Sequence, residues 1–340
     1  MTAGNTRFTF PRGESEVTGR VAAALRYFGS CQQSDGAIPD GSIIRYPTAK
    51  LLKYWDTVNA LKAIAIWREV SADWDEGRVG RVLAYLKAQE KPNGMISWGE
   101  LEVSSAEFCT ETSSEYISAL THLGLREEAG AKARYLRARQ SPAGSWSEVH
   151  PHVPKAFQTT SSVTGFALMA LYELDEEPAY LDEALDFLAK EQTKSGHFGI
   201  NWFYYNTHYY LAGPATAALA AYGCHSAVAA IRDFTLSDQH RDGYWYAEVD
   251  GFSSTISGEL QTVLALRTLV ATGAGLDDPA VRKGLNWLLP QQRADGSWSG
   301  GPYPYPDTES YQEFRALQDV FATSQVLILL GRLMRRKAEQ

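Results

Sequence analysis

The stretch YLRARQSPAGSW (residues 135–146) contains a pattern that recurs along the whole chain. A glutamine is followed after three residues by a glycine, and two residues later by a large apolar or aromatic side chain. WLLPQQRADGSW (residues 287–298) is a nearly identical copy, and only the second of the six copies replaces the glutamine, by glutamate. The six pairs are Gln32 and Gly36, Glu90 and Gly94, Gln140 and Gly144, Gln192 and Gly196, Gln239 and Gly243, and Gln292 and Gly296.

Successive copies lie 58, 50, 52, 47 and 53 residues apart, which indicates one supersecondary unit repeated along the chain. Segments ahead of the glutamines carry charges on one face, which is typical of solvent-facing helices. They include residues 81–89, 129–140, 181–192 and 281–292. Segments after the turns are more uniformly apolar, which is typical of buried helices. They include residues 161–174, 211–223, 256–269 and 320–330.

A helix hairpin of this kind cannot cover its own apolar face. Six of them are therefore expected to close into a ring, and the sequence predicts an all-α fold, an (α/α)6 barrel or toroid, over a single domain of residues 1–340. An open solenoid would need polar caps, whereas residues 321–334 are strongly apolar. The glycine allows a left-handed backbone and the glutamine amide can bond to helix ends, so Trp146, Trp245 and Trp298 are interpreted as stabilising residues.

Composition excludes several classes of function. The net charge is −8, and basic residues cluster only at positions 332–337, so no nucleic-acid partner is expected. Cys31, Cys109 and Cys224 have no CxxC spacing, which argues against disulfides and thiolate zinc sites. Residues 1–16 contain no apolar run of signal-peptide length, and no stretch of 18 apolar residues occurs in the sequence. We expect a soluble cytoplasmic monomer with at most peripheral membrane contact.

The repeated turn resembles the QW motif of the squalene cyclase and oxidosqualene cyclase superfamily, and the resemblance covers essentially the whole chain. That superfamily has an (α/α)6 fold, which protein prenyltransferase β subunits share, and the single-domain length is most similar to monodomain meroterpenoid cyclases. The resemblance implies the fold more specifically than the function. Zinc prenyltransferases carry an Asp-x-Cys pair and a histidine; no Asp-x-Cys occurs here, so no metal is expected and His208 is interpreted as a polar lining residue.

Class II terpene cyclases carry the motif DxDDTA, whose central aspartate protonates an alkene or epoxide. The segment CTETSSEYISAL (residues 109–120) resembles it best, with Glu111 on the central acid, Thr112 on the next aspartate and Cys109 on the first. Two of the three carboxylates of the family motif are thus replaced. Asp56, in YWDTVNALKAI (residues 54–64), aligns with the Asp-Thr part of the motif and is either a helper acid or a helix cap.

The proposed chemistry needs a carboxyl group that is protonated at rest and is still a strong acid. Burial raises the pKa of a carboxyl group, whereas the positive end of a helix strengthens the acid. Thr112 and Glu115 fit a capping box, which predicts that Glu111 lies just before the first turn. Acidic residues are also common near helix starts for a reason unrelated to catalysis, because they interact favourably with the helix dipole. The candidate catalytic residues are Glu111, Cys109, Thr112 and Asp56.

Aromatic faces stabilise carbocations without reacting with them. Aromatic residues gather at one end of every repeat, which predicts a deep apolar pocket, although such residues can also be core filler. The candidate substrate-binding residues are Tyr54, Trp55, Trp98, Phe157, Trp202, Tyr205, His208, Tyr209, Tyr303 and Tyr311. The candidates for holding an anionic or phenolic head group lie in the loops at that end and are Arg45, Lys50, Lys53, His150, His152 and Lys155.

The sequence and the resemblance together predict a protonation-initiated terpene cyclase. Its substrate would be a small isoprenoid molecule, a linear prenyl chain for which an aromatic-acid head group is a candidate, and no cofactor is expected because no P-loop, dinucleotide fingerprint or aspartate-rich motif occurs. Three alternatives remain open. They are a prenyltransferase-like enzyme that uses a prenyl diphosphate, a carbohydrate-active barrel that uses Glu111 with Asp56, and a lipid-binding barrel.

Overall fold

The protein is all-helical over the part of the chain that the structure, a computed structural model, describes. These residues are 13–40, 52–68, 75–100, 108–148, 153, 155–200, 204–246, 256–301 and 317–339. They form α-helices and two 3₁₀ helices, η4 (Lys155–Phe157) and η5 (Leu289–Gln291), with no β-strand. No helix within these ranges is long and apolar enough to cross a membrane.

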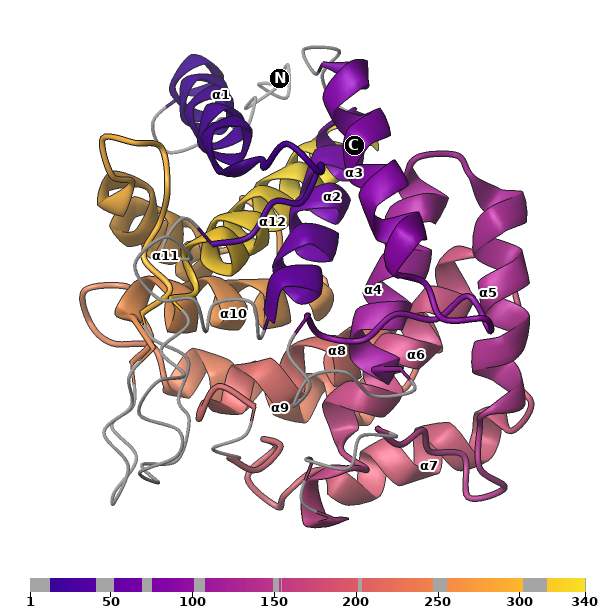
Figure 1. Ribbon diagram of the computed structural model, residues 1–340. Helices are drawn as coiled ribbons and strands as arrows, with labels where there is room; N and C mark the ends of the chain where they lie inside the picture. Colours follow the sequence, from indigo (N-terminus) through magenta and orange to yellow (C-terminus); the bar gives the residue numbers. More distant parts are fainter. Residues whose placement is uncertain are drawn as a thin grey trace, which may run out of the picture.

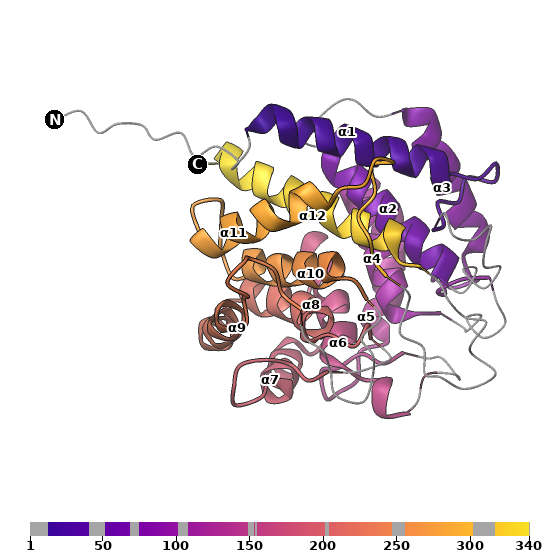
Figure 2. The same ribbon diagram turned by 90° about the vertical axis from the view of Figure 1, so that its left-hand side faces the viewer.

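The α-helices form two concentric layers (Figures 1 and 2). The inner layer consists of α2 (Lys53–Arg68), α4 (Thr110–His122), α6 (Ser161–Glu173), α8 (His208–Ala221), α10 (Gly258–Ala271) and α12 (Asp319–Glu339). The outer layer consists of α1 (Glu14–Cys31), α3 (Glu76–Gln89), α5 (Arg126–Ala138), α7 (Leu181–Glu191), α9 (His225–Ser237) and α11 (Pro279–Leu288). Each inner helix packs on the next and α12 packs on α2, so the ring closes. The predicted (α/α)6 barrel is confirmed.

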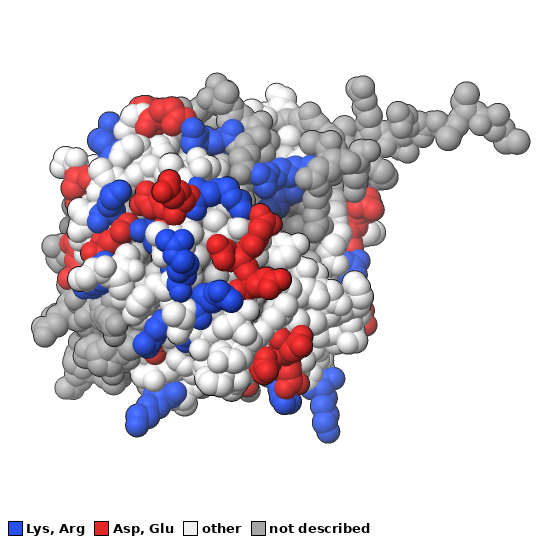
Figure 3. Space-filling model, turned by 90° about the vertical axis from the view of Figure 1, so that its right-hand side faces the viewer, with Lys and Arg blue, Asp and Glu red and all other residues white. Residues whose placement is uncertain are grey.

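Helix boundaries differ from the sequence-based ones by a few residues. Helix α8 begins at His208 rather than at residue 211, because the Thr207 hydroxyl caps it by accepting a hydrogen bond from the Tyr209 amide at 3.4 Å. Helix α12 continues to Glu339, well past residue 330. Charges of both signs are interspersed on the face shown in Figure 3, as expected of solvent-facing outer helices.

The glutamine of each turn joins one outer helix to the next. The Gln140 amide donates to the Gly144 carbonyl and to the Tyr180 carbonyl, both at 2.9 Å, and its Oε1 accepts from the Tyr180 amide at 2.9 Å. Tyr180 is the N-cap residue of α7, the following outer helix. One side chain thus bonds to polar groups of its own turn and of the neighbouring helix start.

The same link recurs around the ring. The glutamine amide donates to the glycine carbonyl of its own turn and to a carbonyl of the next outer helix, namely Gln32 to Arg78, Gln192 to Ala227, Gln239 to Ala280 and Gln292 to Arg20. The last of these joins the sixth repeat to α1, so the closure of the ring uses the same contact as its other junctions.

The glycine of the turn is needed for two reasons, which Gly144 illustrates. Its φ is 83°, in the left-handed region that disfavours a β-carbon. A β-carbon built there would also lie 2.1 Å from the Ala184 amide nitrogen in α7. The glycine therefore sets the distance at which successive outer helices pack.

The aromatic residue of the turn joins the outer layer to the inner one. Trp146 is fully buried; its indole Nε1 donates to the Leu136 carbonyl in α5 at 2.8 Å, and its backbone amide donates to the Thr164 hydroxyl in α6 at 3.2 Å. Trp245 with Thr262 and Trp298 with Thr323 repeat the amide-to-hydroxyl bond at 3.1 and 3.0 Å. These three turns thereby fix the starts of their own inner helices.

The second turn also joins two outer helices, but here the side chain of the turn is the acceptor and the next outer helix supplies the donor. The carboxylate of Glu90 cannot donate a hydrogen bond as a glutamine amide does. Lys132 of α5 supplies the donor instead, with its Nζ 2.8 Å from Glu90 Oε1, and the Tyr116 hydroxyl donates to the same oxygen at 3.0 Å. A buried ion pair thus replaces the amide link to the next outer helix.

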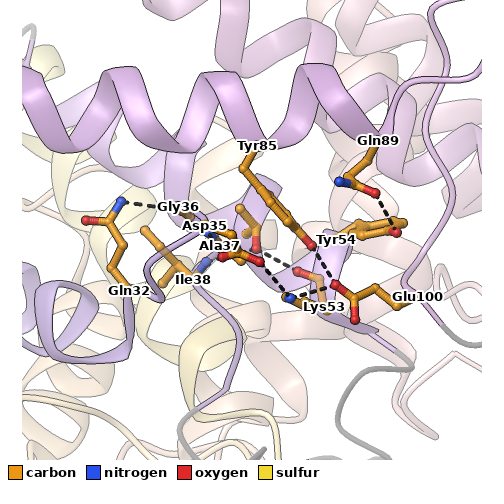
Figure 4. Close-up of polar contacts among 11 residues, drawn as sticks. Gln32, Asp35, Gly36, Ala37, Ile38, Lys53, Tyr54, Tyr85, Gln89 and Glu100 are labelled. Atoms are coloured by element: carbon orange, nitrogen blue, oxygen red, sulfur yellow. Dashed lines mark hydrogen bonds and ion pairs between the residues drawn. The ribbon is translucent and has the colours of Figure 1, made fainter.

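Lys53 does not lie in a loop where it could meet a substrate head group, as the sequence suggested. It is a buried residue at the start of α2, and its Nζ lies 3.2 Å from Asp35 and 2.6 Å from Glu100 (Figure 4). Tyr85 of α3 also donates to Glu100, at 3.2 Å. Lys53 therefore neutralises carboxylates between the first two repeats.

The Glu90–Lys132 pair gives a prediction for stability. Glu90→Gln restores the residue found at the other turns, yet it should lower the free energy of unfolding by about 2 kcal/mol, because it leaves the buried Lys132 ammonium without its main counter-charge. Guanidinium-induced unfolding followed by circular dichroism measures this. Glu128→Gln is the control, since Glu128 lies farther from Lys132, at 3.8 Å, and should have a smaller effect. A Glu90→Gln variant as stable as the unaltered protein would contradict this account of the turn.

Candidate active site

Helix α4 begins at the residues that resemble the family's acidic motif, but its cap is not the predicted one. Cys109 is the N-cap residue, and its Sγ accepts hydrogen bonds from the Thr112 amide at 3.3 Å and the Thr112 hydroxyl at 3.1 Å. Glu115 pairs with Lys62 at 2.7 Å. The expected capping box of Thr112 and Glu115 is therefore wrong, and Glu111 lies inside the first turn, not before it.

A second carboxylate, Glu148, lies at the start of this helix. Its Oε2 accepts from the Thr110 amide at 2.9 Å, and its Oε1 accepts from the Glu111 amide at 3.0 Å and from Cys109 Sγ at 3.4 Å. The side chain is almost completely buried. Two backbone donors and the positive end of the helix dipole stabilise its ionised form. Burial raises the pKa of Glu148, and these hydrogen bonds oppose that rise.

Sequence reasoning missed Glu148, although the repeat carries a signal for it. Glu148 follows Gly144 by four residues, and Asp40 follows Gly36 by the same distance. Asp40 Oδ2 accepts from the amides of Asp319 at 2.7 Å and Val320 at 3.2 Å, at the start of α12. In both repeats an acid after the turn thus binds the amino end of the inner helix of the preceding repeat.

The Glu111 carboxyl group is buried and held by two hydroxyl groups. Ser162 Oγ of α6 lies 2.6 Å from Oε1, and the Tyr210 hydroxyl of α8 lies 2.7 Å from Oε2. Burial and the charge of Glu148 raise the pKa of Glu111, the bonds from Ser162 and Tyr210 lower it, and the net result is a pKa of about 8. Because Glu148 has the two backbone donors, the proton of this pair resides on Glu111 at neutral pH.

The protonated carboxyl group has a ready acceptor in Ser162. A protonated Glu111 must donate one hydrogen bond, and the Ser162 hydroxyl can accept it while donating onward to Thr160 Oγ1, 3.1 Å away. When Glu111 loses its proton, Ser162 and Tyr210 can both donate to the resulting carboxylate. The two hydroxyls therefore match both protonation states of the acid.

Aromatic rings from four inner elements gather next to Tyr210. Ring centroids lie 4.6 Å apart between Tyr205 and Tyr210, 5.0 Å between Tyr205 and Phe321, 5.5 Å between Trp55 and Phe321, and 6.1 Å between Trp55 and Phe166. Tyr205 has a φ of 63°, a conformation that costs about 1 kcal/mol or more for such a residue. It accepts a hydrogen bond from Trp55 Nε1 at 2.9 Å and donates to Gln318 at 3.0 Å.

Several predicted aromatic residues face other parts of the molecule. Tyr54 donates to Gln89 of α3 at 2.9 Å, and the Trp98 carbonyl accepts from the Tyr54 and Trp55 amides at 2.8 and 2.9 Å, at the start of α2. The Phe157 carbonyl accepts from the Tyr204 hydroxyl at 2.9 Å. Trp202, Tyr303 and Tyr311, like the cations Arg45, Lys50, His150 and His152, lie outside the described residues.

Tyr209 and His208 both contact the outer helix α9. The Tyr209 hydroxyl donates to Asp238, and Tyr209 also lines the central cavity. The His208 ring lies 4.5 Å from that of His197 and 5.3 Å from that of Phe234. Burial lowers the pKa of His208.

Asp56 belongs to a second group of acids. It is buried in the first turn of α2, its Oδ2 accepts from the Asp40 amide at 3.4 Å, and its Oδ1 has no hydrogen-bond partner among the described residues. Burial raises its pKa well above the usual value, and the charges of Asp40 and Asp319 raise it further. The structure thus groups Asp56 with these two aspartates.

All six inner helices contribute to a cavity of about 40 Å³ on the axis of the ring. That volume suffices for roughly three water molecules. Phe166, Tyr210 and Phe321 line it, and Glu111 lies behind this wall, where it accepts the hydrogen bond of Tyr210. Within the described ranges, no group of three or more His, Cys, Asp or Glu side chains is arranged to hold a metal ion.

Comparison with known proteins gives sequence similarity over about half of the chain and a shared fold over nearly all of it. Residues 156–324 match the family model of the squalene-hopene cyclase C-terminal domain. The chain is 33% identical over 137 residues to squalene–hopene cyclase of Zymomonas mobilis, covering 36% of this chain and 20% of that protein. It is 27% identical over 183 residues to lanosterol synthase of Candida albicans, covering 50% and 25%. The chain thus spans a quarter or less of these relatives' length.

Among solved structures, the fold is similar to that of the type II terpene cyclase MstE from Scytonema, with a TM-score of 0.70, 17% identity, and coverage of 96% of this chain and 100% of the other. A variant of that cyclase was solved with geranylgeranyl dihydroxybenzoate, its substrate. A glycosidase shares the fold at a TM-score of 0.61 and 16% identity, covering 94% and 97%, so the fold alone does not decide the chemistry. The chain is thus similar over about half of its length to squalene–hopene and lanosterol cyclases, and it shares the toroidal fold of the type II terpene cyclase MstE.

Proposed function

We propose that the protein is a class II terpene cyclase that folds a linear prenyl chain into fused rings, with Glu111 as the proton donor. The observation that carries the proposal is a buried glutamic acid that keeps its proton at neutral pH at the edge of an aromatic cluster. Homology to squalene–hopene cyclase supports the reaction class, and the pairing of Glu111 with Glu148 rather than with Asp56 gives no support to a glycosidase pair.

In this mechanism the Glu111 proton forms a C–H bond with one carbon of an alkene, and the other carbon becomes a cation. Neighbouring double bonds attack in turn and form C–C bonds, and loss of a proton from the final cation ends the cascade without a change in mass. The Glu111 carboxylate left behind accepts hydrogen bonds from Ser162 and Tyr210. The rings of Trp55, Phe166 and Phe321 offer cation–π contacts, each worth about 0.5–2 kcal/mol.

The cavity must widen to admit a prenyl chain, because 40 Å³ holds only a few water molecules. Phe166, Met169 and Phe321 line it, and rotation of these side chains enlarges it without moving the helices. Met169 also lines a second, larger hollow of about 440 Å³, so its flexible side chain lies between the two spaces. Substrate binding on this proposal is coupled to repacking of that wall.

An aromatic acid is the head group we propose for the prenyl chain. The support is the Scytonema cyclase, which shares the fold over nearly the whole chain and whose substrate is geranylgeranyl dihydroxybenzoate. Farnesyl and geranylgeranyl dihydroxybenzoates are therefore the first substrates to test.

Glu111→Gln should abolish cyclisation, with turnover reduced at least about 10³-fold, because an amide cannot supply the initiating proton. Turnover is measured by mass spectrometry and NMR as a cyclic product of unchanged mass, and circular dichroism confirms the helical fold. Asp56→Asn is the matched control: it alters another buried acid and should retain most of the activity. Retained turnover in Glu111→Gln, or equal loss in both variants, would refute the assignment of the donor.

The pH dependence of turnover should report the proton on Glu111. Activity should fall as pH rises through about 8, since the donor is then deprotonated. Glu148→Gln removes a negative charge that raises this pKa, so the alkaline limb should move to lower pH by about one unit. Ser162→Ala removes a hydrogen bond to the carboxylate, so the limb should move to higher pH. Shifts in the same direction in the two variants, or no shift in either, would contradict this account.

A further inference from the structure

The end of the cavity away from Glu111 is charged. Lys62 of α2 and Glu115 of α4 form a buried ion pair at 2.7 Å, and Arg267 of α10 and Arg332 of α12 also line this end. Glu115 lies one helical turn beyond Glu111, and Arg267 lies nine residues into α10, about 13 Å from the start of that helix. The acid and the cations are thus separated along the axis of the ring.

These cations outnumber the carboxylates that face them. Lys62 pairs with Glu115, and Arg332 lies 3.8 Å from Glu173. Although burial opposes ionisation, Lys62, His122 and Arg332 hold the pKa of Glu173 below its usual range, so Glu173 is charged. Three cations therefore face two carboxylates, and Arg267 is the cation left over. Its Nε is buried and has no hydrogen-bond partner among the described residues.

Arg267 remains charged in this environment. Burial and the charge of Arg332 lower its pKa, Glu115 and Glu173 oppose them, and the net result is a pKa of about 10. A partly buried charge without a partner is costly, so an anionic group bound here would be favoured. One uncompensated charge matches a carboxylate better than a diphosphate, which carries several.

An unpaired acceptor lines the same cavity. Asn59 Nδ2 donates to the Trp55 carbonyl at 3.0 Å, so Asn59 Oδ1 is the acceptor for Gln325 Nε2, at 2.9 Å. This network fixes the orientation of the Gln325 amide. Its Oε1 is buried and has no partner within the described part of the chain. The cavity thus presents a cation that lacks an anion and an acceptor that lacks a donor.

We propose that this end of the cavity binds the head group of the substrate, a carboxylate at Arg267 accompanied by a hydroxyl that donates to Gln325 Oε1. The inference rests on the proposed function and assigns the head group to residues of this chain. It also moves the head group away from the loops beside Glu111, where the sequence had suggested it. The terminal phosphate of a diphosphate, when it carries no proton, has no O–H group to donate to Gln325 Oε1, which would stay unpaired. The site therefore favours a hydroxy acid over a diphosphate.

The proposed head-group site lies on the side from which a substrate can enter the cavity. The hollow of about 440 Å³ adjoins the cavity, with Met169, Ala217 and Arg332 lining both. Tyr172, which is 46% exposed, also lines the hollow, so it opens to the surface on the side of the cations. A prenyl chain that enters tail first from this side brings its terminal alkene to Glu111 and leaves its head group at Arg267.

Arg267→Gln tests the site through the kinetics of three substrates with the same prenyl chain: a dihydroxybenzoic acid, its methyl ester, and the prenyl diphosphate. For the free acid, KM should rise roughly 10- to 100-fold with kcat little changed, since a charged hydrogen bond is lost. For the ester, KM should be unaltered. Arg134→Gln, at an exposed position of α5, is the control and should change neither. An equal effect on acid and ester, or a diphosphate preferred over the acid, would overturn the proposal.

Binding without turnover separates this inference from the proposed function. A dihydroxybenzoic acid with a fully saturated side chain cannot be protonated to a cation, yet it should raise the Tm of the unaltered protein and not that of Arg267→Gln. Without ligand, Arg267→Gln should have the higher Tm, because an unpaired buried charge is removed. If this ligand binds through Arg267 while no prenyl substrate is cyclised, the head-group site stands and the cyclase proposal fails. If Arg267→Gln leaves the ligand-induced shift intact, the head-group site fails.

Discussion

The contact on which the rest of the structure depends is the hydrogen bonding of a single side chain at each turn, an amide at five turns and the carboxylate of Glu90 at the second. The Gln140 amide and its counterparts bond to the end of one outer helix and to the start of the next. A helix hairpin alone leaves its apolar face exposed, and the ring buries all six faces only if every junction has the same geometry. The bond from Gln292 to Arg20 shows that the closing junction obeys the same rule, although 272 residues separate its partners.

Ring closure determines where chemistry can occur. Because five of the six turns fix the start of their own inner helix through a Thr or Ser hydroxyl, these helices begin at the same end of the barrel. Their positive helix ends are thereby gathered into one region, where carboxylates are favoured. Glu148 and Asp40 use this field as ionised caps. Glu111 lies beside the first of these caps and Asp56 beside the second, and burial together with the neighbouring charge raises the pKa of both.

The sequence predicted what depends on period and local pattern, and it missed what depends on contacts between repeats. The spacing of the turns predicted the number and order of the helices, and the resemblance to an acidic motif drew attention to Glu111. Glu148 is separated from Glu111 by 37 residues and belongs to the next turn, so no local pattern pairs them. The same limit hid Lys132 as the partner of Glu90 and led to the wrong capping box at Thr112. Arg267 and Gln325 were missed because their importance lies in the partners they lack.

The two ends of the cavity differ in charge: carboxylates lie near Glu111, and an excess cation lies at Arg267. A bound anionic head group would neutralise that cation. Cyclisation creates a positive charge near Glu111, where the new carboxylate and Glu148 stabilise it. As successive rings close, that charge moves along the chain toward the cations at the other end. An unneutralised Arg267 in a medium of low polarity would repel it and disfavour the later ring closures. A carboxylate bound at Arg267 removes this repulsion, so the head group would serve the late steps of the cascade as well as the binding of the substrate.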